Sequence, residues 1–313
     1  MKKSYLKYGL HLAIIIGLII AGVKYLSGDE VWAALKSFDF SYAPLIVVLA
    51  TGYVFLHAWR FLVLTRPYTD ILGHVIFRAY LAGQAATLLP GGMTARAGLL
   101  KQANVPVRKG SVPVFLSSGF DQAVLITGGV VAALWFGYGQ LQILLMSGFF
   151  IALALPLLIP AVRQRLEALA LRLAQRFNLE EQWQGFVEAW PKVFTWRTMA
   201  AGLGLTIVAL VLHFVALDLV LQGLDQELDP TSLALVYILP TVLGRLSGLP
   251  GGFGVTEAGM VGLMTTVSGF ESDTALAIAA IFRIATIVYP ALLGVLVYLI
   301  GWRGEAEATA SVS

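Results

Sequence analysis

Long runs of apolar side chains, separated by short polar segments, dominate this chain. Several runs approach or exceed the roughly 20 residues that a helix needs to cross a bilayer. Because a helix satisfies its backbone hydrogen bonds internally, as lipid requires, these runs predict membrane-spanning helices. They indicate about six crossings, at residues 10–26, 42–64, 111–136, 141–160, 198–222 and 274–300. The first follows Met1-Lys2-Lys3, as a signal peptide would, but no clear small-residue cleavage site precedes residues 26–29, so we expect a retained span.

Two further apolar segments, residues 72–101 and 232–269, are interrupted in the middle by Pro-Gly-Gly. Each half has about 15 to 18 residues, or roughly 22 to 27 Å of helix, which is short for a hydrocarbon core of roughly 30 Å. We therefore expect two re-entrant hairpins that enter the membrane and turn back. The predicted fold is an all-α polytopic membrane protein with a single membrane domain over residues 1–313.

The distribution of lysine and arginine supports this topology, because cytoplasmic loops are enriched in both. With the N-terminus inside, nearly all loop lysines and arginines fall on the cytoplasmic side, and most loop acids fall on the other side. If the broken segments were full crossings, the arginine-rich residues 163–197 would lie outside. Both termini are therefore expected in the cytoplasm.

Two segments outside the spans are expected to be amphipathic. In residues 29–40, Val31, Trp32, Leu35 and Phe38 are spaced for one apolar face of a short helix at the outer interface. Residues 161–194 alternate leucines with arginines, which suits a helix on the inner membrane surface. A solvated linker with a few membrane contacts fits that second pattern equally well.

The Pro-Gly-Gly breaks belong to an internal repeat. Residues 89–98 and 249–259 share the break and, after one inserted residue, an Ala-Gly ending. Each break lies at a hairpin tip between two spans, so residues 42–136 and 198–300 form two units on one plan. In the expected topology the two units run in opposite directions. Many secondary transporters place a substrate site near the midplane between such inverted repeats.

The two turns have the chemistry of an anion site. Proline ends the incoming helix, and the paired glycines permit a tight reversal that lets a ligand approach the backbone. The helix after each turn then presents free N–H groups and the positive end of its dipole inside the membrane. The alternative is a structural bend whose free groups are capped by Thr94 or by neighbouring helices. The duplication favours the anion site.

Charged residues within the apolar segments need a partner or a water-filled cavity, because burying an ionised group in lipid costs at least about 2.5 to 3.5 kcal/mol. Asp121 and Arg283 have equivalent places in the two units, and we expect a buried charge pair, with direct substrate contact as the alternative. Arg96 and Arg245 each lie within a few residues of a turn, where phosphate is the expected guest. Two other arginines lie nearer the inner helix ends and are expected to snorkel to the interface. They are Arg60 and Arg78.

The composition agrees with a membrane protein and narrows the chemistry. Of the 313 residues, 58% are hydrophobic and 12% are charged, whereas soluble domains carry about 25% charged residues. The absence of cysteine excludes disulfides, thiolate metal sites and cysteine nucleophiles. The net charge of +3 comes without a dense basic run, so nucleic acid is not an expected partner. The four histidines are scattered without ligand spacing and catalytic motifs are missing, so neither a metal nor a cofactor is expected.

One motif relates the chain to a family. Its sequence is Pro250-Gly251-Gly252-Phe253-Gly254-Val255-Thr256-Glu257. It resembles the Pro-Gly-Gly-x-Gly-x-x-Glu signature of the lysylphosphatidylglycerol synthase transmembrane-region family, also described as flippase-like domain proteins. The resemblance covers about residues 8–302 and includes Trp59-Arg60-Phe61, Leu88-Leu89-Pro90-Gly91 and Asp121.

The chain departs from that family at the first turn. The family commonly follows its first Pro-Gly with an arginine and then a Gly-Glu pair, where this chain has Gly92, Thr94 and Ala95. Arg96 would take over the role of the missing arginine. The resemblance implies movement of lipid-linked anions across the membrane. Some members carry a soluble aminoacyl-transfer domain, for which this chain leaves no room, so lysyl-lipid synthesis is not expected.

The sequence thus predicts a non-enzymatic, flippase-like transporter of the cytoplasmic membrane. Its partner would be an anionic phospholipid or a polyprenyl-phosphate lipid, with the head group bound at a midplane cavity between the hairpins. Glu257 would orient an arginine or take up a coupled proton. The expected binding residues are Gly91, Gly92, Thr94, Arg96, Arg245, Gly251, Gly252, Gly254, Thr256 and Glu257. A membrane-embedded transferase that uses a lipid-phosphate donor, a scaffold for an envelope enzyme, and a homodimer all stay open.

Overall fold

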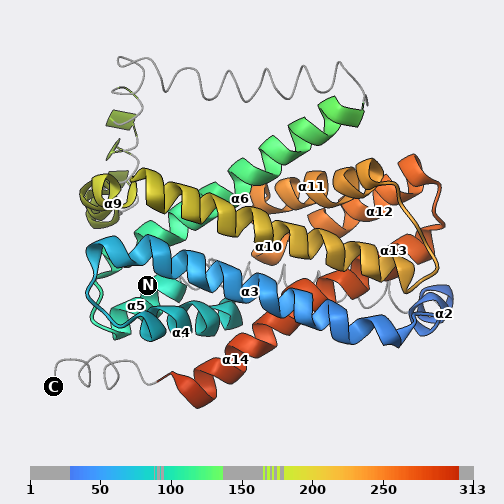
Figure 1. Ribbon diagram of the computed structural model, residues 1–313, viewed down its shortest axis with the longest axis horizontal. Coiled ribbons are helices and arrows are strands. Elements are labelled where there is room, and N and C mark those ends of the chain that lie inside the picture. The colour runs from blue at the N-terminus through green and yellow to red at the C-terminus, as the bar shows by residue number, and fades with distance from the viewer. Residues whose placement is uncertain are drawn as a thin grey trace. The chain divides into compact units, whose positions relative to one another are not determined.

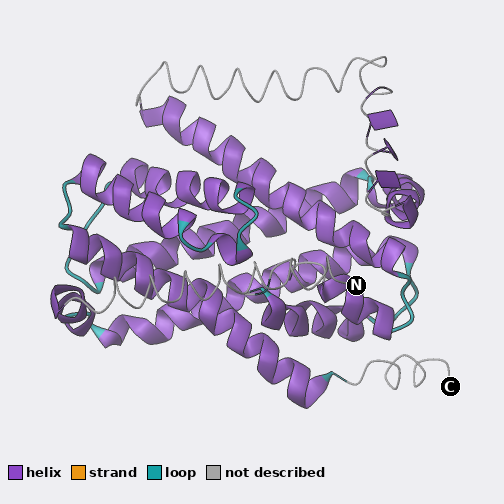
Figure 2. Cartoon of the chain, turned by 180° about the vertical axis from the view of Figure 1, so that it is seen from behind, coloured by secondary structure: helices purple, strands orange, loops and turns teal. Residues whose placement is uncertain are grey.

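The computed structural model describes residues 29–87, 89, 92, 95–136, 165, 168–169, 171–172, 175–176 and 180–302. Helices make up most of this part of the chain, and no strand occurs in it (Figure 1 and Figure 2). The helices are α2 Asp29–Lys36, α3 Ala43–Thr65, α4 Gly73–Gly83, α5 Ala95–Gln102, α6 Val107–Phe136, α9 Glu180–Val193, α10 Trp196–Gln222, α11 Pro230–Leu246, α12 Val255–Ser268, α13 Ser272–Arg283 and α14 Tyr289–Gly301. Short 3-10 turns cover Phe40–Tyr42, Arg66–Tyr68, Gln84–Ala86 and Pro250–Gly252, and a π-helical segment, Ile284–Val288, joins α13 to α14.

Within the described residues, four helices are long and apolar enough to cross a membrane. They cover Phe40–Tyr68, Val107–Val131, Trp196–Gln222 and Ser272–Gly301, and they coincide with four of the crossings predicted from the sequence. Large apolar side chains on them face outward, including Leu292, Leu299 and Ile300 on α14, which are 63%, 75% and 73% exposed. Such exposure suits lipid rather than water. The crossings predicted at residues 10–26 and 141–160 lie outside the described residues.

The same order of elements occurs twice. In the first half a long helix, α3, is followed by the short helices α4 and α5 and then by the long α6. In the second half α10 is followed by α11 and α12 and then by the continuous run from α13 to α14. Each pair of short helices is packed together and flanks a Pro-Gly-Gly sequence. The re-entrant path of these pairs and the opposite direction of the two units stay predictions.

The amphipathic segments form helices in part. Residues 29–36 form α2 as expected, but Phe38 lies beyond its end and is 6% exposed, whereas Trp32 is 55% exposed. Phe38 packs on Gly223, where a Cβ atom would overlap its ring, so it belongs to the protein interior and not to an interfacial face with Trp32. Within the predicted linker at 161–194, α9 is helical and the described arginines are exposed. Its attachment to the membrane surface stays a prediction.

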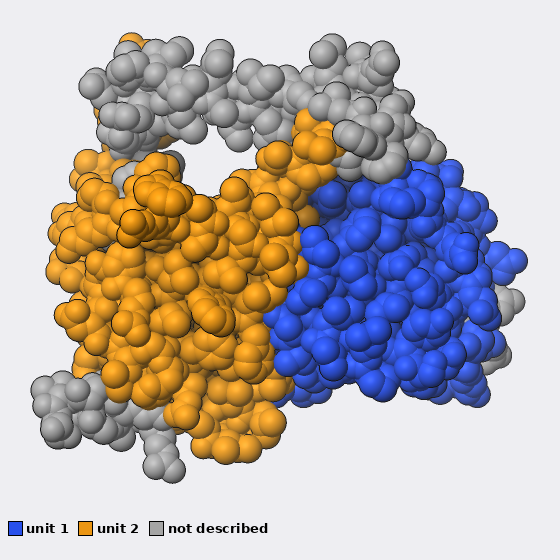
Figure 3. Space-filling view, viewed as in Figure 1, with its two compact units in different colours: residues 1–53, 86–92, 210–292 blue, residues 54–85, 93–209, 293–313 orange. Residues whose placement is uncertain are grey.

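The chain divides into two compact units (Figure 3). Unit 1 contains residues 1–53, 86–92 and 210–292, and its described core includes Met260, Met264 and Ile278. Unit 2 contains residues 54–85, 93–209 and 293–313, and its described core includes Phe61 and Leu100. The boundary falls inside α3 and α10, which contribute to both units. Each unit includes one of the short-helix pairs.

Candidate functional site

The second Pro-Gly-Gly turn, in unit 1, has a backbone that requires glycine. Gly251, Gly252 and Gly254 have φ angles of 58°, 68° and 82°, in the region that other residues rarely adopt. A Cβ atom at Gly244 or Gly252 would also collide with the hydroxyl of Thr256, which is 3% exposed. The turn therefore packs closely against α11, and the hydroxyl of Thr256 at the start of α12 fills the space beside both glycines.

Arg283 holds this turn together. Its Nε donates to Glu257 Oε1 at 2.5 Å, and a terminal guanidinium nitrogen donates to the carbonyl of Gly251. The other oxygen of Glu257 accepts from the N–H of Gly254 at 2.6 Å, which satisfies one of the free donors at the start of α12. Arg245 lies close enough to repel the guanidinium of Arg283. Glu257 thus contacts an arginine at the second turn. Of the two roles expected for Glu257, the orientation of an arginine fits this contact, and the uptake of a coupled proton stays a prediction.

The first turn places Arg96 in a different setting, in unit 2. Its guanidinium carbon lies 4.3 Å from the centre of the Tyr80 ring, and one terminal nitrogen donates to Gln84 Oε1 at 3.2 Å. The residue is half-buried, and its Nε is buried without a hydrogen-bond partner. In the described part of the chain, Arg96 has no carboxylate partner. Gly83 allows this arrangement, because a Cβ atom there would overlap the Arg96 side chain.

Not every predicted residue of the first turn can be placed. Gly92 is buried, its N–H donates to the carbonyl of Leu89 at 2.9 Å, and a Cβ atom on it would overlap the carbonyl of Ala86. That contact explains why glycine stands there. Gly91 and Thr94 lie outside the described residues.

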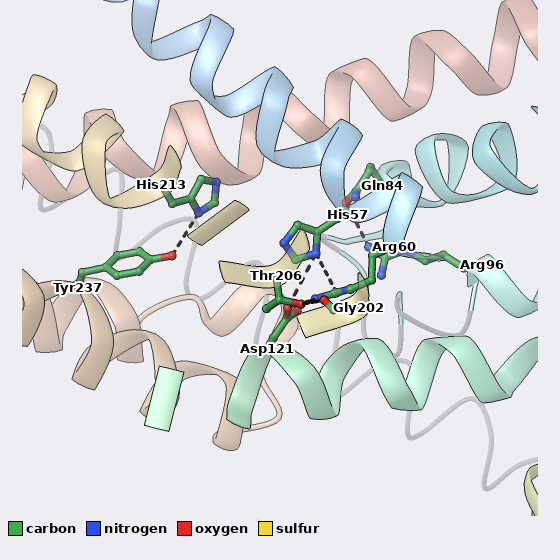
Figure 4. Close-up of polar contacts among 9 residues, drawn as sticks. All are labelled: His57, Arg60, Gln84, Arg96, Asp121, Gly202, Thr206, His213 and Tyr237. Atoms are coloured by element: carbon green, nitrogen blue, oxygen red, sulfur yellow. Dashed lines mark hydrogen bonds and ion pairs between the residues drawn. The ribbon is translucent and has the colours of Figure 1, made fainter. Parts of the chain in front are cut away.

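A buried polar cluster in unit 2 was not predicted as a group (Figure 4). Arg60 on α3 is 1% exposed, and one of its terminal nitrogens donates both to Asp121 Oδ1 on α6 and to Thr206 Oγ on α10, the latter at 2.7 Å. Its other terminal nitrogen lies 2.8 Å from Nδ1 of His57. Thr206 in turn donates to the carbonyl of Gly202 at 2.7 Å. The cluster joins three helices through one guanidinium.

These contacts correct two predictions. The expected partner of Asp121 was Arg283, but Asp121 pairs with Arg60 in unit 2 and Arg283 pairs with Glu257 in unit 1. Arg60 was expected to snorkel to the interface, but it is buried and carries the counter-charge of Asp121. Depth along a helix is what the sequence indicates, and depth does not tell which way a side chain points around the helix. The missed signal was the three-residue spacing of His57 and Arg60, which puts both on one helix face.

The other titratable groups offer little metal chemistry. Among the described residues, no three histidine, aspartate or glutamate side chains gather as metal ligands would. His213 in unit 1 is 6% exposed and stacks on Tyr53 with ring centres 3.4 Å apart. Its Nδ1 lies 3.4 Å from the hydroxyl of Tyr237 (Figure 4). This environment fits the expectation of a histidine packed within the protein.

The four long apolar helices of the described residues define a polytopic helical membrane protein. Residues 9–294 match the model of the family described as Lysylphosphatidylglycerol synthase TM region. The chain belongs to that family, which confirms the resemblance found in the motif at the second turn. Membership indicates a function related to membrane lipids. The comparison with curated proteins gives no match.

Proposed function

We propose that this protein is a flippase-like transporter that moves an anionic lipid or lipid-linked phosphate across the cytoplasmic membrane, and that Arg96 binds the head group. One observation carries the proposal. Arg96 is a half-buried guanidinium with no carboxylate partner in the described part of the chain, and its polar contact there is the neutral amide of Gln84. A cation in such surroundings is favoured by an anionic ligand, because desolvation leaves its charge uncompensated.

The contacts of Arg96 prepare it for a phosphate. The ring of Tyr80 supports one side of the guanidinium, and Gln84 accepts from one terminal nitrogen. The fork of the guanidinium retains further N–H donors, and these match the oxygens of a phosphate in a way that the ammonium of lysine does not. A lipid could present its phosphate here while its tails stay in the bilayer.

The second turn also has features that favour the binding of an anion. Arg245 and Arg283 repel one another near a turn with three glycines of positive φ, and Glu257 orients Arg283. An anion beside Arg245 would reduce this repulsion. That Arg245 and Arg96 serve the same head group stays a prediction from the sequence.

The test is translocation of labelled phosphatidylglycerol in vesicles that contain the purified protein. Replacement of Arg96 by alanine should slow translocation by about tenfold or more. A hydrogen bond to a charged group contributes about 1.5 to 3 kcal/mol, and 1.4 kcal/mol corresponds to a factor of about ten. Replacement by lysine should restore only part of the rate, because the fork is lost while the charge remains. Arg197→Ala is the matched control, since Arg197 also lies over an aromatic ring, Trp196, at 5.9 Å, but is exposed. A wild-type rate for Arg96→Ala would overturn the proposal.

A further inference from the structure

The tautomer of His57 follows from its neighbour. A guanidinium has five N–H donors and no acceptor. The terminal nitrogen of Arg60 that lies 2.8 Å from His57 Nδ1 must therefore donate, and Nδ1 must accept with its lone pair. In this state the ring proton is on Nε2 and His57 is neutral.

The same nitrogen of His57 also faces a carboxylate. Asp121 Oδ1 lies 3.9 Å from His57 Nδ1 and accepts a hydrogen bond from Arg60. The three residues are 2%, 9% and 1% exposed for His57, Asp121 and Arg60. One cation, one anion and one neutral ring make the buried trio electrically neutral.

A proton on Nδ1 would rearrange this trio. Nδ1 would lose the lone pair that accepts from Arg60, and its new N–H would face the N–H of Arg60, donor against donor, so the two side chains would have to separate. Asp121 Oδ1, which lies 3.9 Å from Nδ1, is a carboxylate acceptor that the new N–H could then reach. The site would then hold two cations and one carboxylate. Such an excess buried charge is costly, and a nearby anion would offset it.

The charged groups that take part in this exchange come from two helices. Arg60 lies on the same helix as His57, and Asp121 comes from α6. Helix α10 contributes Thr206, whose uncharged hydroxyl accepts a hydrogen bond from Arg60. Helix α4 packs against α3 with aromatic rings, of which Phe77 contacts Phe55 and Tyr80 contacts Phe61.

We propose that His57 is the proton-binding site of the transporter and that its protonation shifts Asp121 from Arg60 to His57, so that a proton and an anionic head group are carried together. A hydronium ion on one side of the membrane supplies the proton, the Nδ1 lone pair forms the new N–H bond, and water on the other side receives the proton when the lipid leaves. No electron is transferred. The inference rests on the proposed transport function and names its coupling ion.

The coupling is reciprocal by thermodynamic necessity. If a bound anion favours the protonated trio, protonation must raise the affinity for the anion by the same factor. For couplings of the usual size this factor is roughly 5- to 150-fold. Binding of phosphatidylglycerol to the protein in detergent should therefore tighten as the pH falls through the range where His57 titrates.

The first experiment replaces His57 by asparagine, whose amide oxygen can accept from Arg60 at the place of Nδ1 but cannot be protonated. Vesicles would contain a trapped pH dye and labelled phosphatidylglycerol, with a pH difference imposed in either direction. In the wild type, lipid movement should be accompanied by proton movement and should respond to the pH difference. His57→Asn should lose both effects. The control is His74→Asn, because His74 is exposed at the start of α4 and should keep the wild-type response.

A second measurement separates this inference from the proposed function. Nuclear magnetic resonance of the protein with isotope-labelled histidine can resolve its four histidines, and the signal absent from His57→Asn belongs to His57. We expect a neutral ring with the proton on Nε2, which becomes protonated on acidification and does so more readily with phosphatidylglycerol present. If the wild type moves no lipid but His57 behaves in this way, the transport proposal fails and the proton site stands. A proton on Nδ1 in the neutral ring, or a wild-type pH response of His57→Asn, would overturn the proton site.

Discussion

Neutralising Asp121 tests the buried cluster most sharply. In Asp121→Asn the new amide oxygen can still accept from Arg60, and the contacts of Arg60 with Thr206 and His57 remain. What is lost is the negative charge next to a guanidinium that is 1% exposed. Breaking a buried pair by removing one partner costs about 3 to 5 kcal/mol. Because the remaining acceptors still satisfy Arg60, we expect a loss near the lower end, about 3 kcal/mol.

The double variant separates pairing from simple destabilisation. Arg60→Met combined with Asp121→Asn removes both charges, so it should cost less than the sum of the single changes by about 0.5 to 3 kcal/mol. The comparison is Asp121→Asn combined with Arg283→Met, the pair that the sequence suggested. Their effects should add, because Arg283 has its partner Glu257 in its own unit.

The free energy of unfolding can be measured by reversible denaturation in mixed detergent micelles, followed by circular dichroism. The reasoning is refuted if the Arg60 and Asp121 effects add within about 0.5 kcal/mol. A strong coupling between Asp121 and Arg283 would instead restore the prediction made from the sequence.

Two further predictions concern the second hairpin. Gly244→Ala should destabilise the protein by about 1 to 3 kcal/mol because its methyl group would overlap Thr256. The control is Gly262→Ala on α12, where a Cβ atom would have no neighbour within 4 Å, and it should be neutral or stabilising in the same unfolding assay. Equal losses of stability in the two variants would contradict the close contact at Gly244. Asp229 caps α11, and hydrogen bonds from Ser232, that of its side chain first, lower the pKa of this carboxyl. A carboxyl whose pKa is lowered by folding stabilises the fold at pH values above its ordinary pKa of about 3.9, and this contribution is lost as the pH falls through the lowered pKa. Asp229→Ala should therefore cost about 0.5 to 2 kcal/mol of unfolding free energy at neutral pH and less in acid. A stability difference between variant and wild type that does not change with pH would show that the cap is not ionised.

The spans were predictable because they depend on composition over a long window. Residues 42–64 and 198–222 were placed within about two residues of α3 and α10, the usual uncertainty of helix ends. The second turn was also predictable, since Pro-Gly-Gly and the spacing of Glu257 from Gly254 have direct backbone consequences. In both cases the signal is local in the sequence.

The pairing of buried charges was not predictable in this way. Arg60 and Asp121 are 61 positions apart, and their contact depends on how α3 and α6 are rotated about their axes. Both spans are apolar all round, so hydrophobic periodicity gives no indication of that rotation. The support of Arg96 by Tyr80 likewise depends on the close approach of α4 and α5 at Gly83. These contacts become visible only when the helices are packed.

Native mass spectrometry of the lipids retained by the purified protein tests the central claim, an anionic head group bound at Arg96, most directly. The wild type and Arg197→Ala should retain an anionic phospholipid, and Arg96→Ala should lose it while its unfolding transition stays intact. Retention of the same anionic lipid at the same occupancy by Arg96→Ala would contradict the claim.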